Sequence, residues 1–214
     1  LMEHMKKNLI ISTGWGDSLA VLVKMLQPLD LNPDIVQLMG SVTCESISST
    51  PQAVVTSLAE MFHGHADFLN LPLYIPNDYV RETLCNDANN SVILKKGIFC
   101  DKVIASIGTM GKIRESDYWR GSMPPEIYKD LVEKGACGSI LGRFFDANGQ
   151  ELACDWNEKS ISLSIQQLRN ISDVVIVASP VSKAPALLAA LKGDFINTLI
   201  TDGTTATRIL NEAK

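Results

Sequence analysis

The chain has 214 residues, of which 46% are hydrophobic and 20% are charged, and its formal net charge is −5. These values are typical of a globular domain with a full core, and no stretch approaches the roughly 18 continuous apolar residues of a membrane-spanning helix. The negative charge disfavours nucleic-acid binding by the chain itself, because Lys and Arg supply that affinity. Five cysteines without a CxxC pair favour reduced thiols and a cytoplasmic protein.

The first eight residues, LMEHMKKN, have a helical pattern, with Met2 and Met5 three positions apart. No capping residue precedes them, and they lack the architecture of a signal peptide. We therefore expect a helix that begins before Leu1, and a chain that is part of a longer protein.

Apolar runs alternate with helical patterns along the rest of the chain. Runs typical of strands that are buried on both faces occur at residues 8–13, 34–40, 67–71, 102–108, 173–179 and 197–202. Helices are predicted at residues 18–26, 51–63, 78–85, 124–134, 183–191 and 204–213, and the second of these has Thr50 as its N-cap and Pro51 at its first position. This alternation predicts one α/β domain, a mostly parallel sheet with helices on both faces.

One stretch, CGSILGRFFDANGQELACDWNEKSISLSI, interrupts the alternation. Its Asn148-Gly149 pair lies between two strand-like arms and predicts a β-hairpin inserted beside the sheet. Arg143 and Asp146 flank two phenylalanines and can form an ion pair that positions the hairpin. The polar residues that follow, in CDWNEKS, either fold over a ligand site or remain solvated in a loop; they are Asp155, Asn157 and Glu158.

Ligands of such sheets bind outside the carboxyl ends of the strands. The first loop there, STGWGDSL, lacks the third glycine of a dinucleotide fingerprint and the Gly-Lys-Ser/Thr of a P-loop. Its backbone N–H groups and Ser18 can bind an anion at the start of a helix, or Asp17 or Ser18 can simply cap that helix. Lys183 is predicted in the first turn of a late helix, where the dipole disfavours a cation unless an anion is near. It is either a phosphate contact or an exposed surface lysine.

The tryptophans Trp15, Trp119 and Trp156 all fall in predicted loops, where they either stack on a sugar ring or pack into the core. His63 and His65 have no cysteine or carboxylate at metal-ligand spacing, so no metal site is expected. The sequence contains no Gly-x-Ser-x-Gly nucleophile elbow either.

Seven segments in order resemble the effector-binding domain of SorC/DeoR-type bacterial transcriptional regulators: STGWGDSL, DIVQLMGSV, HADFLNLPLYIP, DKVIASIGTMG, EKGACGSILGRFFDANGQ, VVIVASPVSKAPALLAAL and INTLITDGTTATRIL. The resemblance runs in register from about residue 5 to residue 210. It implies a fold similar to sugar-phosphate isomerases and glucosamine-phosphate deaminases, without catalysis and without a cofactor. It also implies a phosphorylated sugar or related metabolite as effector, a homodimer or homotetramer, and operator DNA bound only through an N-terminal helix-turn-helix that this chain lacks.

Carried over from the family, the ligand-facing positions are Gly14, Trp15, Gly16, Ser18, Gly40, Ser41, Gly108, Ser139, Arg143 and Lys183.

Three positions depart from the family pattern. Ser139 replaces a frequent aspartate, and Ser179-Pro180 replaces a frequent Gly-Gly ahead of the lysine. Met39 stands where one branch of the family has a lysine that forms a Schiff base, so no imine is expected there. The alternative function is a sugar-phosphate isomerase or deaminase, which would need a general base. The available carboxylates are Asp17, Glu45 and Asp202, none of which lies in a motif of those enzymes.

Overall fold

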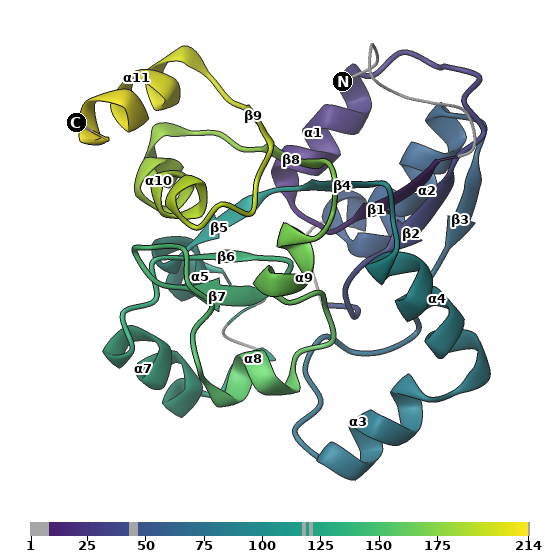
Figure 1. Ribbon diagram of the computed structural model, residues 1–214, viewed down its shortest axis with the longest axis horizontal. Helices are drawn as coiled ribbons and strands as arrows, with labels where there is room; N and C mark the ends of the chain where they lie inside the picture. Colours follow the sequence, from purple (N-terminus) through teal and green to yellow (C-terminus); the bar gives the residue numbers. More distant parts are fainter. Residues whose placement is uncertain (1–8, 43–46, 117–118, 120–121, 214) are drawn as a thin grey trace.

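The computed structural model describes residues 9–42, 47–116, 119 and 122–213 (Figure 1). Its larger sheet has six parallel strands in the order β3-β2-β1-β4-β8-β9. These strands are β1 (Ile10–Thr13), β2 (Asp34–Gln37), β3 (His65–Asp67), β4 (Lys102–Ala105), β8 (Val174–Val177) and β9 (Thr198–Ile200). The smaller sheet is antiparallel, in the order β5 (Ile107–Thr109), β6 (Gly138–Ile140), β7 (Arg143–Phe145).

This architecture confirms the predicted α/β class with a mostly parallel sheet. The predicted N-terminal helix, Cys44 and Glu45 lie outside the described residues. Strand order runs outward from β1 in one direction and from β4 in the other. In open parallel sheets this reversal leaves a crevice at the carboxyl ends of the two central strands, where ligands bind.

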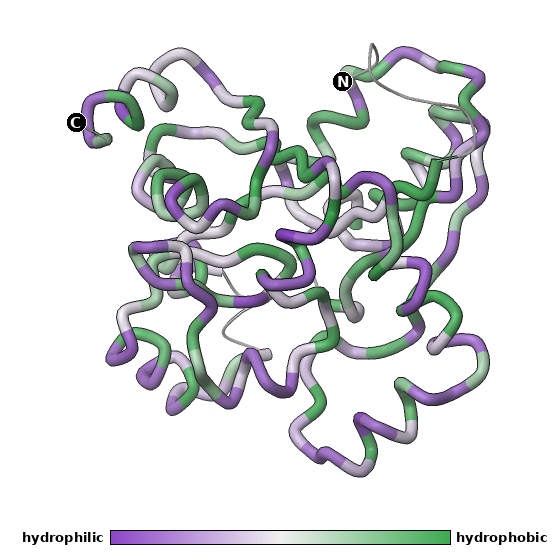
Figure 2. Tube along the Cα trace, viewed as in Figure 1, coloured by the Kyte–Doolittle hydropathy of each residue, from purple (hydrophilic) through white to green (hydrophobic). Residues whose placement is uncertain are grey.

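Ten helices of the described part connect and cover the sheets: α1 (Asp17–Met25), α2 (Pro51–Met61), α3 (Asp78–Cys85), α4 (Ala88–Ile98), α5 (Met110–Glu115), α7 (Pro125–Glu133), α8 (Asp155–Lys159), α9 (Ile165–Arg169), α10 (Ala184–Lys192) and α11 (Gly203–Glu212). Short 3-10 turns precede α2 (Ile47–Ser49) and α10 (Val181–Lys183). Figure 2 shows hydrophilic and hydrophobic residues alternating along outer helices such as α3 and α7. Within the described residues, no helix combines the length and apolar character needed to cross a bilayer.

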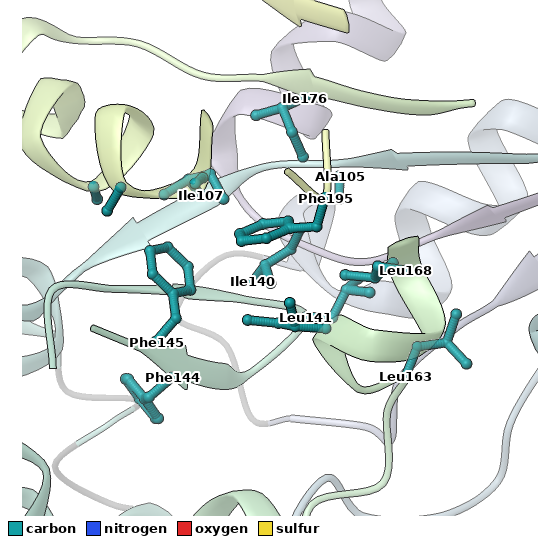
Figure 3. Close-up of a cluster of buried hydrophobic side chains, with 14 of the residues drawn as sticks. Ala105, Ile107, Ile140, Leu141, Phe144, Phe145, Leu163, Leu168, Ile176 and Phe195 are labelled. Carbon is teal, nitrogen blue, oxygen red and sulfur yellow. The ribbon is translucent and has the colours of Figure 1, made fainter. Parts of the chain in front are cut away.

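The side chains of the central strand β4 alternate between two cores. Ile104 packs with α1 and α2 on one face, whereas Val103 and Ala105 join the larger core on the other face. That larger core includes the small sheet. Figure 3 shows Phe145 and Phe144 projecting from opposite faces of β7, and Phe145 meets Phe195 with ring centroids 5.5 Å apart. The small sheet is therefore packed against the main body of the molecule.

Five of the six predicted helices match within one residue at each end, and the sixth, α2, ends two residues before the predicted limit. The Thr50 cap is confirmed, since its Oγ1 accepts a hydrogen bond from the backbone N–H of Ala53 (3.2 Å). The sequence patterns missed α4, α5, α8 and α9. Helix α4 contains Gly97, where a Cβ would come within 2.8 Å of Leu38, so a helix-weakening glycine permits its close packing on β2.

Two predicted strands differ from the structure. The run at residues 102–108 is divided at Ser106, where the chain leaves the parallel sheet as β4 and enters the small sheet as β5. The predicted strand at 67–71 ends at Asp67, because Leu69 and Leu71 turn into a separate small core with Ile161.

The predicted hairpin is corrected in detail. Its two strands, β6 and β7, are joined at Leu141-Gly142, where both residues have positive φ. The Asn-Gly pair forms the next turn, whose far arm has a single bridge to Phe145. The predicted ion pair between Arg143 and Asp146 is wrong. Arg143 pairs with Glu151 (2.7 Å), while the Asp146 carboxylate accepts the backbone N–H groups of the turn.

Asn157, expected in a loop that either folds over a ligand or remains solvated, is instead 2% exposed within α8. Its amide accepts the N–H of Phe144 and donates to the carbonyls of Phe144 (2.8 Å) and Leu152 (2.9 Å). Together with the backbone N–H of Leu152, which donates to the Phe144 carbonyl (3.0 Å), it therefore completes the hydrogen bonding at the outer edge of β7.

Replacement of Asn157 by Ala leaves the buried N–H of Phe144 and the half-buried carbonyl of Leu152 without these partners, whereas the Phe144 carbonyl keeps the N–H of Leu152. We expect a loss of unfolding free energy of about 2–4 kcal/mol, since each unsatisfied buried group costs about 1–3 kcal/mol. Urea unfolding followed by circular dichroism measures this loss. Asn211→Ala on exposed α11 is the matched control, and equal stability of the two variants would contradict the bracing role.

Candidate ligand-binding site

A cavity of about 440 Å³ lies at the carboxyl ends of β1, β4 and β8. It therefore occupies the position at which the strand order reverses, as the topology predicts. The loop after β1 supplies Gly14, Trp15, Asp17 and Ser18, and the β4–β5 connection with β5 supplies Ser106, Ile107, Gly108 and Thr109. The small sheet and the loop after β8 close the remaining sides with Ser139, Leu141, Gly142, Ser179, Pro180 and Lys183.

Six of the ten ligand-facing positions line this cavity together: Gly14, Trp15, Ser18, Gly108, Ser139 and Lys183. The other four lie outside its lining. Gly16 is the N-cap of α1, with φ of 124°, a value that favours glycine. Ser41 accepts hydrogen bonds from Gln37 and Gln52, and Gly40 lies against Pro72, where a Cβ would come within 2.4 Å of a backbone oxygen.

Arg143 binds its own chain rather than facing the cavity. Its guanidinium pairs with Glu151 and donates to the carbonyl oxygens of Asn157, Ser160 and Ser162 at 2.7–3.2 Å. All three guanidinium nitrogens therefore have partners inside the protein. Its position in the structure indicates that it braces the segment from α8 to α9, against which the small sheet packs.

Lys183 is the half-buried cation of the cavity. Its Nζ lies 3.4 Å from Ser18 Oγ and 3.2 Å from Ser106 Oγ, and no carboxylate of the described residues comes within 4 Å of it. Burial, opposed by the charge of Asp17 and reinforced by that of Lys112, lowers the pKa of Lys183 to about 8. Burial thus disfavours the charged form of the Lys183 ammonium group.

The backbone of Lys183 ends the turn at Val181–Lys183 and stands at the N-cap position of α10, just before the helix rather than in its first turn. The positive end of the α10 dipole therefore lies at the backbone of this residue. The start of α1 likewise has no side-chain cap, so the proposed capping by Asp17 or Ser18 is wrong.

Two of the three tryptophans line the cavity. Trp15 and Trp119 have ring centroids 6.1 Å apart and an interplanar angle of 51°. Trp15 is half-buried and also packs against the large core, so its ring contacts both the cavity and the core. Trp156 is buried in α8 and donates from Nε1 to the carbonyl of Gly142 (2.8 Å). Of the two alternatives, stacking on a sugar ring or packing into the core, the second therefore holds for Trp156.

Several polar residues of the cavity were not predicted as ligand contacts, notably Lys112, Ser106 and Ser179. Lys112 is exposed in the first turn of α5. Thr109 caps this helix, because its Oγ1 accepts a hydrogen bond from the backbone N–H of Lys112. The Thr-x-x-Lys spacing after a strand could have indicated it, but α5 itself was not predicted.

Of the three carboxylates considered for an enzyme, Asp17 lines the cavity, Asp202 lies outside its lining, and Glu45 falls outside the described residues. Asp202 does not line the cavity; it caps α11 and accepts hydrogen bonds from Thr205 and Ser179. The Thr205 hydrogen bonds lower the pKa of Asp202 to about 2, which makes it a weak base. Asp17 is exposed to water at the cavity.

The described residues contain no group of three potential metal ligands, and the four cysteines among them, Cys85, Cys100, Cys137 and Cys154, are free thiols. Met39, where a Schiff-base lysine stands in one branch of the family, is fully buried in the core. None of these residues adds chemistry to the cavity.

Comparison with known sequences gives a consistent assignment. Residues 1–211 match the family described as "Putative sugar-binding domain". The chain is 27% identical over 211 residues to the deoxyribonucleoside regulator of Bacillus subtilis and 24% identical over 204 residues to the sorbitol operon regulator of Klebsiella pneumoniae. The two alignments cover 98% and 94% of this chain but only 67% and 64% of the regulators, so the chain spans about two thirds of their length.

Solved structures show the same fold. A transcriptional regulator from Streptococcus pneumoniae TIGR4 superposes with a TM-score of 0.92 at 23% identity, over 99% of this chain and 81% of the other. The full-length sorbitol operon regulator SorC from Klebsiella pneumoniae superposes with a TM-score of 0.90 at 23% identity, over 98% of this chain and 68% of the other. These relatives are transcriptional regulators, not enzymes. The chain belongs to the sugar-binding domain family of SorC/DeoR-type transcriptional regulators.

Proposed function

We propose that this domain senses a phosphorylated sugar in the cavity at the β1/β4 reversal. The observation that carries the proposal is the half-buried ammonium group of Lys183, which has no carboxylate partner among the described residues and lies beside the start of α10. A phosphate bound there would compensate this charge. The charge-assisted hydrogen bond that it gains is of a kind worth roughly 1.5–3 kcal/mol.

The surroundings of Lys183 suit a phosphate group. Helix α1 begins at the cavity without a side-chain cap, and the hydroxyls of Ser18 and Ser106 already lie within 3.5 Å of Lys183 Nζ. Phosphates bind at helix N-termini, where N–H groups and the dipole attract negative charge. A single phosphate can thus be contacted from loops after β1, β4 and β8.

The rest of the cavity suits a sugar. Trp15 offers aromatic surface for a sugar ring, with the buried Trp119 packed against it, and Ser139, Thr109 and the Asp17 carboxylate offer hydrogen bonds to hydroxyls. The volume of about 440 Å³ lies within the usual range of small-molecule sites, about 300–1,000 Å³.

The regulatory part of the proposal rests on the relatives. Proteins of this family are transcriptional regulators about half as long again as this chain, so operator DNA would be bound by a segment outside the chain, in the cytoplasm. The effector would shift the balance between two arrangements by its differential affinity for them. A homo-oligomer would provide those arrangements, and the exposed apolar side chains of Leu191, Ile200 and Leu210 near edge strand β9 could contribute to its interface.

A panel of hexose, pentose and alditol phosphates, followed by melting temperature and by product formation, tests the proposed ligand class. We expect one compound to raise the melting temperature without turnover, because only the folded domain binds it. Lys183→Ala is expected to weaken that compound at least tenfold, about 1.4 kcal/mol, while the far-ultraviolet circular dichroism stays unchanged. Turnover, or unaltered affinity by calorimetry, would reject the proposal.

Removing the charge of Lys183 should also stabilise the ligand-free domain. Its pKa is lowered in the folded state, so folding is penalised while the group is protonated, and the penalty disappears as pH rises from about 8 toward the unfolded value of 10.5. Lys183→Met is therefore expected to gain about 1–3 kcal/mol of unfolding free energy at pH 7 and little at pH 10.5.

Urea unfolding of the wild type and the variant at both pH values measures this gain. Lys24→Met, at the exposed far end of α1, is the matched control and should leave stability nearly unchanged. A Lys183→Met gain that is equal at pH 7 and pH 10.5 would show that the charge is not the cause.

A further inference from the structure

A second cavity, of about 280 Å³, lies between helices α3 and α4 and the segment at residues 160–163. It lies on the side of the molecule away from α10 and α11 (Figure 1), and none of the described residues lines both cavities. Its walls are mainly apolar and include Leu38, Ile93, Leu94, Ile161 and Leu163. The second cavity is therefore separate from the one at the carboxyl ends of β1, β4 and β8.

Gln37, at the end of β2, brings a buried hydrogen-bond acceptor to the second cavity. The residue is 1% exposed, and its Nε2 donates to the carbonyls of Met39 (2.8 Å) and Leu69 (3.2 Å). Because carbonyl oxygens only accept hydrogen bonds, these two contacts fix which end of the amide carries the nitrogen. The Oε1 atom then has no hydrogen-bond partner among the described residues. Such buried polar atoms are uncommon, because leaving one unpaired costs folding free energy.

Arg81, on α3, brings a buried donor to the same cavity. Its Nη1 donates to the carbonyl of Glu158 (2.9 Å), and its Nη2 pairs with Asp78 (2.8 Å). Its Nε is buried and has no partner in the part of the chain that the structure describes. One residue of the lining thus has an unused acceptor, and another has an unused donor.

The lining of the second cavity carries no uncompensated charge. Its charged side chains, among the described residues, are Arg81 and Arg143, and their guanidinium groups pair with Asp78 and Glu151. Burial raises the pKa of the Cys85 thiol, against the opposing charge of Arg81, so this lining residue is uncharged at neutral pH. An ionic ligand would lose its hydration here without gaining a counter-charge.

We propose that the second cavity binds a small uncharged molecule with an apolar body and a polar end that both donates and accepts a hydrogen bond, such as a hydroxyl group. The polar end donates to Gln37 Oε1 and accepts from Arg81 Nε. Both atoms are covered from water in this structure, so the Arg81 side chain, which is 26% exposed, shifts to admit the ligand. The volume suits a compact molecule, since an apolar cavity of about 150 Å³ can hold benzene.

Methyl-resolved NMR with three matched probes tests the site and its chemistry. Benzyl alcohol has both a donor and an acceptor, benzyl methyl ether lacks the donor, and benzoate is charged. We expect benzyl alcohol to shift the methyl resonances of Ile93 and Ile161 and to leave those of Ile107 and Ile113, in the first cavity, unchanged. The ether should bind about fivefold more weakly because it leaves Gln37 Oε1 unpaired, and benzoate should bind at least about tenfold more weakly.

Two variants with matched controls test the residues. Arg81→Lys keeps a positive charge beside Asp78 but replaces the Nε–H group by a methylene, so benzyl alcohol should bind about threefold to fivefold more weakly. Arg208→Lys, the same change on exposed α11, should leave its affinity unchanged. Cys85→Met extends a side chain into the second cavity and should weaken both neutral probes, whereas Cys137→Met, at a half-buried thiol outside both cavities, should not.

The proposal is overturned if benzyl alcohol, near its solubility limit, shifts no methyl of Ile93 or Ile161. Equal affinities for the alcohol and the ether, or benzoate binding as tight as that of the alcohol, overturn the assigned chemistry. Binding that neither Arg81→Lys nor Cys85→Met weakens overturns the assigned site. Circular dichroism verifies that the variants fold, and the three probes decide on the wild-type domain if a variant does not. None of these outcomes bears on the proposed function, because the two cavities share no lining among the described residues.

Discussion

The cavity is organised around a positive charge that the protein does not neutralise. Lys183 has hydroxyl partners but no carboxylate among the described residues, and burial lowers its pKa to about 8. Proteins rarely keep an unpaired charge out of water unless a partner arrives from outside. Holding the charged Lys183 in a half-buried place lowers the stability of the ligand-free domain. A bound anion removes this cost, and the free energy regained adds to its affinity. The site is therefore prepared for a ligand at some cost to the fold that carries it.

The surroundings of Lys183 depend on a break in a regular strand. The strand that begins as β4 breaks at Ser106, which places a hydroxyl beside Lys183 and sends the chain into the small sheet. The small sheet then forms a wall of the cavity through Ser139, Leu141 and Gly142. Its edge is held by the side chain of Asn157, while Arg143 fastens the following segment through Glu151 and several carbonyls. Buried polar groups with complete sets of partners make this wall rigid.

Hydrophobic runs, caps and breakers indicated most of the parallel sheet and six of its helices, because strands buried on both faces are continuous apolar segments. Patterns failed where tertiary contacts override local preference. Gly97 lies within α4 because Leu38 leaves no room for a side chain, and the Ser106 break is invisible in an apolar run that continues past it. The hairpin was expected at Asn148-Gly149, yet its strands join at Leu141-Gly142, where a leucine adopts positive φ.

Family resemblance placed six of ten site positions on the cavity, since loops at strand ends converge in any fold of this type. Arg143 lies outside the cavity lining, and the sequence cannot show that its guanidinium is bonded to Glu151 and to carbonyls up to 19 residues away. Lys112 was missed because helix α5, which carries it to the cavity, was not predicted from the sequence.

The unpaired charge of the cavity can be observed as the pKa of Lys183, measured by NMR through the ¹³Cε resonance of a selectively labelled lysine. We predict a value near 8 for the ligand-free domain and a clear increase when methyl phosphate or a sugar phosphate is bound, because the anion favours the charged form. A value near 10.5 that does not respond to either compound would contradict it.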